Sequence, residues 1–250
     1  MKLNLRQPLL LAFLLLSQVA LGQDDYSARD IVEAAHAASG GKAWRKPRSL
    51  ELVGVATFYK DGDASQATRI DDYHMWRVFP DQSAEAHRAN GMVRFDAISD
   101  NQLVFQISYD GKHSYNQSGR IEDEAANTRW QSNFGFGIIR FALDEGFELT
   151  RMADDTVDGH PSFMIQVRDA AGKDTLFGID RSNFQIRMVG FDTPKGWHHR
   201  IYDNFEWHRD PKFLQPTSVR LYYNGVKTND ITWYEYGVNQ PIDPSLFTLQ

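Results

Sequence analysis

The sequence predicts a mainly β (α+β) fold in which a single curved antiparallel sheet forms an incomplete β-barrel of about nine to eleven strands. Two observations lead to this prediction. From Leu50 onward, apolar and polar side chains alternate with a period of two in segments rich in β-branched and aromatic residues. Dipeptides typical of tight hairpins, such as Asp61-Gly62 and Asn224-Gly225, separate these segments. We expect an N-terminal helix and a central helical insertion to close the barrel.

The N-terminus is predicted to be an export signal that is not part of the fold. A short basic start precedes an apolar run over residues 9–20, and small residues follow it. The run is shorter than the roughly 20 apolar residues that a membrane span needs. We therefore expect residues 1–22 to be cleaved near Gly22, which leaves one domain over residues 23–250.

The charge of the chain argues against several classes of partner. The 250 residues contain 33 acidic and 27 basic side chains, and the formal net charge is -6. Loss of residues 1–22 removes Lys2 and Arg6 and no acid, so the mature charge becomes -6 - 2 = -8. An acidic chain without a basic run is a poor ligand for nucleic acid or for an anionic membrane surface. Because the chain has no cysteine, burial alone must hold the fold together.

Two segments lack the strand alternation. Residues 27–41 are predicted to form a helix, because Ser27 and Asp30 have the spacing of a capping box and Gly40-Gly41 ends the run. Residues 122–147 are predicted to be a broken apolar helical insertion that acts as a lid or plug. The large apolar residues that recur there at helical spacing are Trp130, Phe134, Ile138 and Phe141.

The segment "GWHHRIYDNFEWHRD" (196–210) raises the question of a metal or acid/base site. On a regular strand His198 and His199 point to opposite faces, and His198 and His208 stand about 33 Å apart. No zinc site spans that distance, so we predict no metal here and expect His198 and His208 to face solvent. The odd positions form the more apolar face, which either packs as ordinary core or lines a cavity.

The other strands favour a cavity, since a curled sheet of about ten strands encloses more volume than its own side chains fill. We expect no catalytic residues and no metal. The candidate ligand-binding residues are Leu52, Phe58, Phe105, Ile107, Trp130, Phe134, Ile138, Phe141, His199, Ile201, Phe205, Trp207 and Trp233.

Four stretches in this order resemble a known family: "SLELVGVATFY" (49–59), "YDGKHSYNQ" (109–117), "VDGHPSFMIQVRDAAGKDTLFGID" (157–180) and "VNQPIDPSLFTL" (238–249). The chain resembles the LolA/LolB-like periplasmic lipoprotein-carrier superfamily over nearly its whole mature length, and especially the outer-membrane lipoprotein-sorting proteins.

The resemblance implies a periplasmic carrier whose apolar cavity binds acyl chains of a lipoprotein or lipid, with no catalytic residues and no cofactor. It also implies a membrane donor or acceptor protein as partner. The carriers hold their lid with an arginine next to a proline. Arg77 in "MWRVFP" is the counterpart, although two residues separate it from Pro80. Arg77 is therefore a possible lid latch.

Two other functions remain open. A periplasmic lipid-sensing module would use the same cavity to regulate a protein partner. A hydrolase or metal-dependent enzyme is less favoured, because the sequence contains none of the usual nucleophile, zinc, phosphate or dinucleotide motifs. We expect a monomer and no nucleic-acid partner.

Overall fold

The structure is a computed structural model that describes residues 26–79, 91–128 and 137–250. The predicted signal segment lies outside these ranges. The first group of strands comprises β1 (Ser49–Lys60), β2 (Asp63–Val78), β3 (Met92–Ser99), β4 (Gln102–Tyr109), β5 (Ser114–Asn116) and β6 (Gly119–Arg120). The second group comprises β7 (Glu148–Arg151), β8 (Asp155–Val157), β9 (His160–Arg168), β10 (Asp174–Asp180), β11 (Ile186–Thr193), β12 (Gly196–His208), β13 (Phe213–Tyr223) and β14 (Val226–Val238). The short helices are α1 (Ala28–Ser39), α2 (Lys42–Arg45), α3 (Glu124–Thr128), and the 3-10 turns η2 (Ile138–Phe141) and η3 (Pro244–Phe247).

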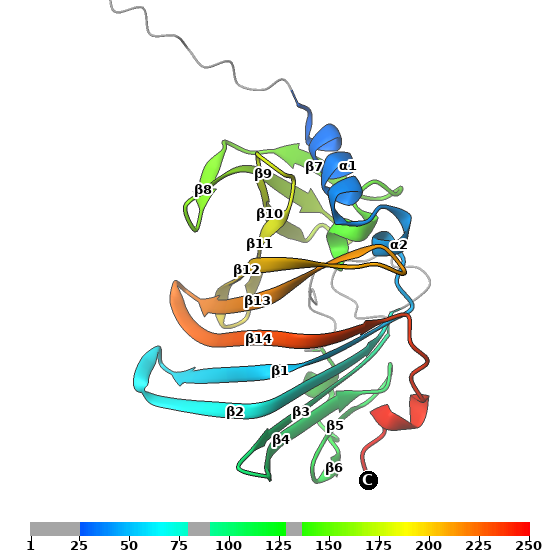
Figure 1. Ribbon diagram of the computed structural model, residues 1–250, viewed down its shortest axis with the longest axis vertical. Coiled ribbons are helices and arrows are strands. Elements are labelled where there is room, and N and C mark those ends of the chain that lie inside the picture. The colour runs from blue at the N-terminus through cyan, green and yellow to red at the C-terminus, as the bar shows by residue number, and fades with distance from the viewer. Residues whose placement is uncertain (1–25, 80–90, 129–136) are drawn as a thin grey trace, which may run out of the picture.

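All the described strands belong to one antiparallel sheet of fourteen strands, which curls without closing (Figure 1). Its order is β6-β5-β4-β3-β2-β1-β14-β13-β12-β11-β10-β9-β7, with β8 paired to β9. The predicted fold class, an incomplete barrel of antiparallel strands, is confirmed. The strand count was too low, because β5, β6, β7 and β8 contain only two to four residues each and show no readable period.

The hairpin turns have the backbone that their sequences predict. Asp61 and Gly62 have φ angles of 52° and 79°, and Asn224 and Gly225 have φ angles of 49° and 80°. Positive φ at both central residues is the geometry of the tight hairpin turn that follows the twist of the strands. These turns set the register of β1 with β2 and of β13 with β14.

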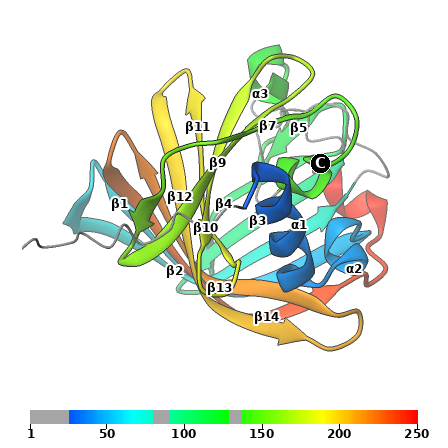
Figure 2. The ribbon, with the colours of Figure 1, turned by 90° about the horizontal axis from the view of Figure 1, so that it is seen from above.

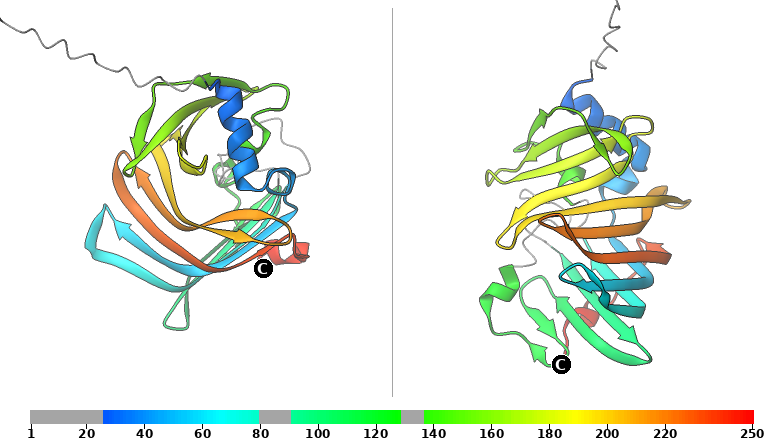
Figure 3. Two further views of the ribbon diagram at one scale, coloured as in Figure 1. Left: turned by 45° about the horizontal axis from the view of Figure 1, so that its top comes forward. Right: turned by 90° about the vertical axis from the view of Figure 1, so that its left-hand side faces the viewer.

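Helix α1 begins as the sequence predicts. The Ser27 side chain accepts a hydrogen bond from the Asp30 amide, and the Asp30 carboxylate accepts one from the Ser27 amide at 2.9 Å. The helix lies across the concave side of the sheet, in contact with β7 and β13 (Figure 3). Its apolar face is fully buried there, with Ile31, Val32 and Ala35 at 0% exposure.

The concave side is filled unevenly along the sheet. At the α1 end the strands are densely packed, and Phe163, Ile165 and Phe177 have no exposed surface. Viewed from above, α1 lies inside the curl of the sheet and α2 lies next to it (Figure 2). The N-terminal helix therefore acts as the plug of one half of the sheet, which leaves the other half to hold the cavity described below.

The predicted insertion over 122–147 is only partly described. It contains α3 and η2, and the predicted lid residues Trp130 and Phe134 lie outside the described ranges. In η2, Ile138 is buried at 1% exposure and Phe141 is half-buried. A hydrogen bond links η2 to α2, in which Arg45 Nε donates to the Arg140 carbonyl oxygen at 3.0 Å.

Candidate functional site

A cavity of about 340 Å³ lies on the concave face, where β1–β4 meet β12–β14. This volume is within the range of small-ligand sites. Most of its wall is apolar: Leu50, Leu52, Phe58, Tyr73, Met75, Phe79, Phe95, Phe105, Ile107, Pro216, Val219, Leu221, Ile231 and Trp233. The polar lining residues are Arg77, Arg140, Arg200, Tyr202, Gln215 and Asn229. No Asp or Glu is among the described residues of the wall.

Five rings on β1–β4 and β14 form an aromatic cluster at the cavity wall. Tyr73 is stacked between Phe95, at 5.7 Å between ring centroids, and Trp233, at 5.4 Å. Phe58 meets Tyr73 edge-on at 5.8 Å and Phe105 at 5.6 Å. Such offset and edge-to-face pairs hold the rings in place, so the apolar wall is largely preformed.

Three guanidinium groups form a second cluster, which we call the arginine cluster. Arg77 comes from the end of β2, Arg140 from η2 and Arg200 from β12. The Arg77 guanidinium lies over the Phe79 ring at 4.5 Å, and that of Arg140 lies over the Trp44 ring at 4.0 Å. Arginine tolerates this apolar setting because its planar group stacks on aromatic rings.

The arginines of this cluster destabilise one another's charge. Burial, followed by the neighbouring charge of Arg200, lowers the pKa of Arg77 to about 9. Burial and then the charge of Arg77 lower the pKa of Arg140 well below its usual value. A negative charge placed near these buried groups would favour their charged form.

The structure brings five of the predicted lining residues together with Arg77 at the cavity wall: Leu52, Phe58, Phe105, Ile107 and Trp233. Whether they contact a ligand stays a prediction, as does the lid role of Arg77. Phe205 is half-buried against the main core and is not part of the described wall. Ile138 and Phe141 are also placed outside it.

The predicted face of β12 was wrong for three candidates. Ile201 packs in a separate apolar cluster with Val157 and Met164. His199 stacks on Tyr222 at 4.7 Å between ring centroids, and Tyr222 packs against that same cluster. Trp207 is 47% exposed. In place of these odd positions, Arg200 and Tyr202 of the even face line the cavity.

Within β12, Asn204 has a φ angle of +51°, although the pairing with β13 keeps the same register before and after this residue. Asparagine adopts this left-handed region more readily than most residues. Tyr202 and Phe205 both pack against the main core although three positions separate them. An asparagine in the middle of a strand pattern is the sequence signal of this irregularity, because asparagine is depleted in strands.

The prediction that His198 faces solvent was also wrong, whereas His208 is half-buried. His198 is 2% exposed and not solvated. Arg200 Nε donates to His198 Nε2 at 3.0 Å, and His198 Nδ1 donates to the Tyr222 carbonyl oxygen at 3.0 Å. Burial, followed by the charge of Arg200, lowers the pKa of His198 to about 3, which keeps it neutral. His208 instead donates from Nδ1 to the Pro211 carbonyl oxygen at 3.0 Å.

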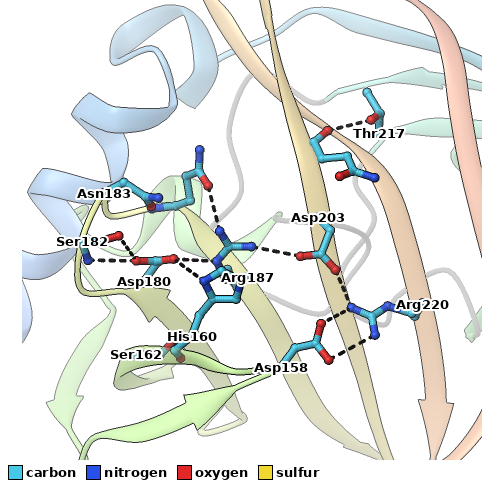
Figure 4. A network of polar contacts seen from close by, with 12 residues as sticks. Asp158, His160, Ser162, Asp180, Ser182, Asn183, Arg187, Asp203, Thr217 and Arg220 are labelled. Atoms are coloured by element: carbon cyan, nitrogen blue, oxygen red, sulfur yellow. Dashed lines mark hydrogen bonds and ion pairs between the residues drawn. The ribbon is translucent and has the colours of Figure 1, made fainter.

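A polar network links strands of the second half of the sheet (Figure 4). Arg187 bridges Asp180 at 2.7 Å and Asp203 at 3.0 Å. Arg220 pairs with Asp203 and with Asp158, the latter at 2.6 Å, and its hydrogen bond lowers the pKa of Asp158. Each of these carboxylates is already bound by an arginine, which is the arrangement of a structural network. Among the described residues, no group of three or more His, Asp or Glu side chains could hold a metal ion.

The fold is shared with known proteins at low sequence identity. An outer membrane lipoprotein-sorting protein domain from Vibrio parahaemolyticus is 12% identical, with a TM-score of 0.50 over 88% of this chain and 97% of that one. A LolA superfamily protein from Nitrosomonas europaea is 14% identical, with a TM-score of 0.50 over 89% and 98%. A DUF1329 family protein from Desulfovibrio piger is 9% identical, with a TM-score of 0.50 over 88% and 95%.

The resemblance to the LolA/LolB-like superfamily is thus confirmed at the level of the fold. No family model and no curated protein matches the sequence. Within the described ranges, no helix is long and apolar enough to cross a membrane.

Proposed function

We propose that the protein is a periplasmic carrier that binds the acyl chain of a lipid or lipoprotein in the concave cavity. The observation that carries this proposal is the apolar wall of a preformed cavity, in a fold shared with a lipoprotein-sorting domain. The carrier acts by binding and release, without catalysis or a cofactor. It works as a monomer between a membrane donor and an acceptor protein.

The energetics suit reversible transport. Each buried methylene contributes about 0.8 kcal/mol, so a chain of ten methylenes gains roughly 8 kcal/mol and one of fifteen gains roughly 12 kcal/mol. Association costs at least about 4 kcal/mol, which leaves dissociation constants in the millimolar to micromolar range. A carrier with such affinities can both bind its ligand and release it.

The proposal is tested by uptake of a fluorescent fatty acid into two variants of β14. Trp233 is 5% exposed and lines the cavity, whereas its neighbour Tyr234 is 61% exposed. We expect Trp233→Asp to abolish uptake, because it places a charge in the apolar wall. Tyr234→Asp, the matched control on the opposite face of the strand, should bind as the wild type does.

A second variant covers the case in which Trp233→Asp fails to fold. Leu221 lines the cavity and is only half-buried, so Leu221→Trp should fill part of the space without unfolding the sheet. We expect weaker binding of long chains than of short ones in this variant. Unchanged uptake by a folded Leu221→Trp protein would contradict binding in this cavity.

Carrier and sensor are separated by what happens to the bound lipid. A carrier hands a labelled fatty acid to acceptor vesicles faster than the lipid transfers through buffer alone. A protein that binds the same probe but does not accelerate its transfer would be a sensor instead.

A further inference from the structure

The arginine cluster brings together three positive charges from distant parts of the chain. Arg77, Arg140 and Arg200 all line the same cavity, and the described wall contains no carboxylate. An acyl chain alone needs no charged contact, so the proposed carrier function does not explain these residues.

Arg140 is the most constrained of the three. It is 4% exposed, its guanidinium donates to the Trp44 carbonyl oxygen, and its Cζ atom lies 5.4 Å from the centroid of the Phe213 ring. Its Nε atom is buried and makes no hydrogen bond to the described part of the chain. A buried donor left without an acceptor is costly, and an acceptor oxygen on a ligand in the cavity would satisfy it.

Arg200 is positioned by its neighbour. Its Nε donates to the neutral His198, which in turn is fixed by the Tyr222 carbonyl oxygen. This arrangement occupies Nε and orients the guanidinium at the cavity wall. His198 is therefore a positioning residue, which explains why a histidine is kept neutral beside an arginine.

Several other described arginines form ion pairs within the protein. Arg94 forms a two-point ion pair with Asp96, at 2.8 and 2.7 Å, and Arg187 binds two aspartates in the network of Figure 4. The cavity differs, because Arg140 forms no ion pair with the described residues and has the like charge of Arg77 nearby. A guanidinium is the usual protein partner of carboxylates and phosphates, which it binds with two parallel hydrogen bonds.

The aromatic cluster supplies the other half of the recognition. Tyr73 and Arg77 lie on the same face of β2 four positions apart, which is about 13 Å along the strand. The cavity thus has both an apolar wall and a cationic cluster at a distance that suits a ligand with a tail and a head.

Building on the proposed carrier function, we propose that the cargo is an anionic amphiphile whose carboxylate or phosphate head group is held by Arg77, Arg140 and Arg200 while its acyl tail lies against the aromatic cluster. Fatty acids and lipids with a phosphate monoester share this chemistry.

The test is calorimetric titration of the mature chain with four ligands of equal chain length, each below its aggregation concentration. These are dodecanoate, dodecyl phosphate, dodecanol and dodecyltrimethylammonium. We expect one or both anions to bind at least about tenfold more tightly than the alcohol, because charge-assisted hydrogen bonds add to the burial of the tail. The stronger of the two anions identifies the head group.

Variants assign the preference to the cluster. Arg200→Gln and Arg77→Gln should each weaken binding of the preferred anion about tenfold and leave dodecanol within about twofold. Arg69→Gln is the matched control, because Arg69 is on the same strand as Arg77 and its side chain is 67% exposed. It should bind all four ligands as the wild type does.

The outcomes separate this inference from the proposed function. Equal or tighter binding of dodecanol or of the cation overturns the head-group assignment and leaves the carrier intact. Inorganic phosphate that binds as tightly as dodecyl phosphate would also overturn it, since the tail would then contribute nothing. If none of the four ligands binds a folded protein, the carrier function itself is wrong.

Discussion

Stability should fall steeply as the pH drops from 6.5 to 5, because two histidines are buried in the neutral form. His36 is 4% exposed, and its Nε2 donates to the Ile139 carbonyl oxygen at 2.7 Å. Burial lowers the pKa of His36 to about 4, and burial with the Arg200 charge lowers the pKa of His198 to about 3. In the unfolded chain both groups titrate near about 6.5.

The direction of this pH dependence depends on whether the folded or the unfolded chain binds protons more readily. Below pH 6.5 the unfolded chain takes up protons at both histidines, whereas the folded protein takes them up only near pH 4 and 3. The stabilisation is therefore complete above about pH 6.5 and is lost as the pH falls, at about 1.4 kcal/mol per pH unit and histidine. At pH 5 the loss is about 2 kcal/mol for each and about 4 kcal/mol for both. Burial lowers the pKa of His199 as well, which adds to the same trend.

The assay is urea unfolding, followed by tryptophan fluorescence, from pH 7.5 to 5 at constant ionic strength. His198→Gln and His36→Gln keep a hydrogen-bond donor but cannot titrate, and each should remove about 2 kcal/mol of the pH dependence at pH 5. A wild-type free energy of unfolding that changes by less than about 1 kcal/mol over this range would refute the reasoning. So would a double variant with the full wild-type slope.

Two further predictions concern the sheet itself. Gly54→Ala should lower the free energy of unfolding by about 3 kcal/mol or more, because the added Cβ would lie 2.1 Å from a backbone oxygen of β14. Gly237→Ala is the milder comparison, since its Cβ would meet a flexible side chain at 3.2 Å. Urea unfolding of both variants measures the difference. Arg187→Leu should destabilise the fold by about 3 kcal/mol, since it removes the arginine partner of the buried carboxylate of Asp180. Arg187→Leu with Asp180→Leu should recover part of that loss, and a double variant no more stable than the single one would contradict the assignment.

The long strands and the first helix could be predicted because their signals are local. In the ten strands of seven residues or more, apolar and polar residues tend to alternate. Helix α1 begins at a capping box whose residues, Ser27 and Asp30, can be recognised in the sequence. The strands β5 to β8 could not be predicted, because two to four residues contain too few positions to define a period. Their pairing depends on the neighbouring strands of the sheet.

The apolar wall was easier to predict than the charged one. The faces of Leu52, Phe58 and Trp233 could be predicted from the sequence, because each lies in a stretch where apolar and more polar residues alternate. The arginine cluster depends on the curl of the sheet and on η2, which together bring residues 77, 140 and 200 to one place. No local pattern in the sequence predicts that these three distant residues come together.

The pairing of β1 with β14 joins the earliest long strand of the chain to the last one (Figure 1). During synthesis β1 emerges long before its second neighbour exists, and its open edge offers unsatisfied backbone groups to any passing strand. Completion of the sheet must wait for the C-terminal hairpin, and such distant pairings fold slowly. Because β1 pairs with both β2 and β14, the centre of the sheet is complete only after the last strand of the chain has been made.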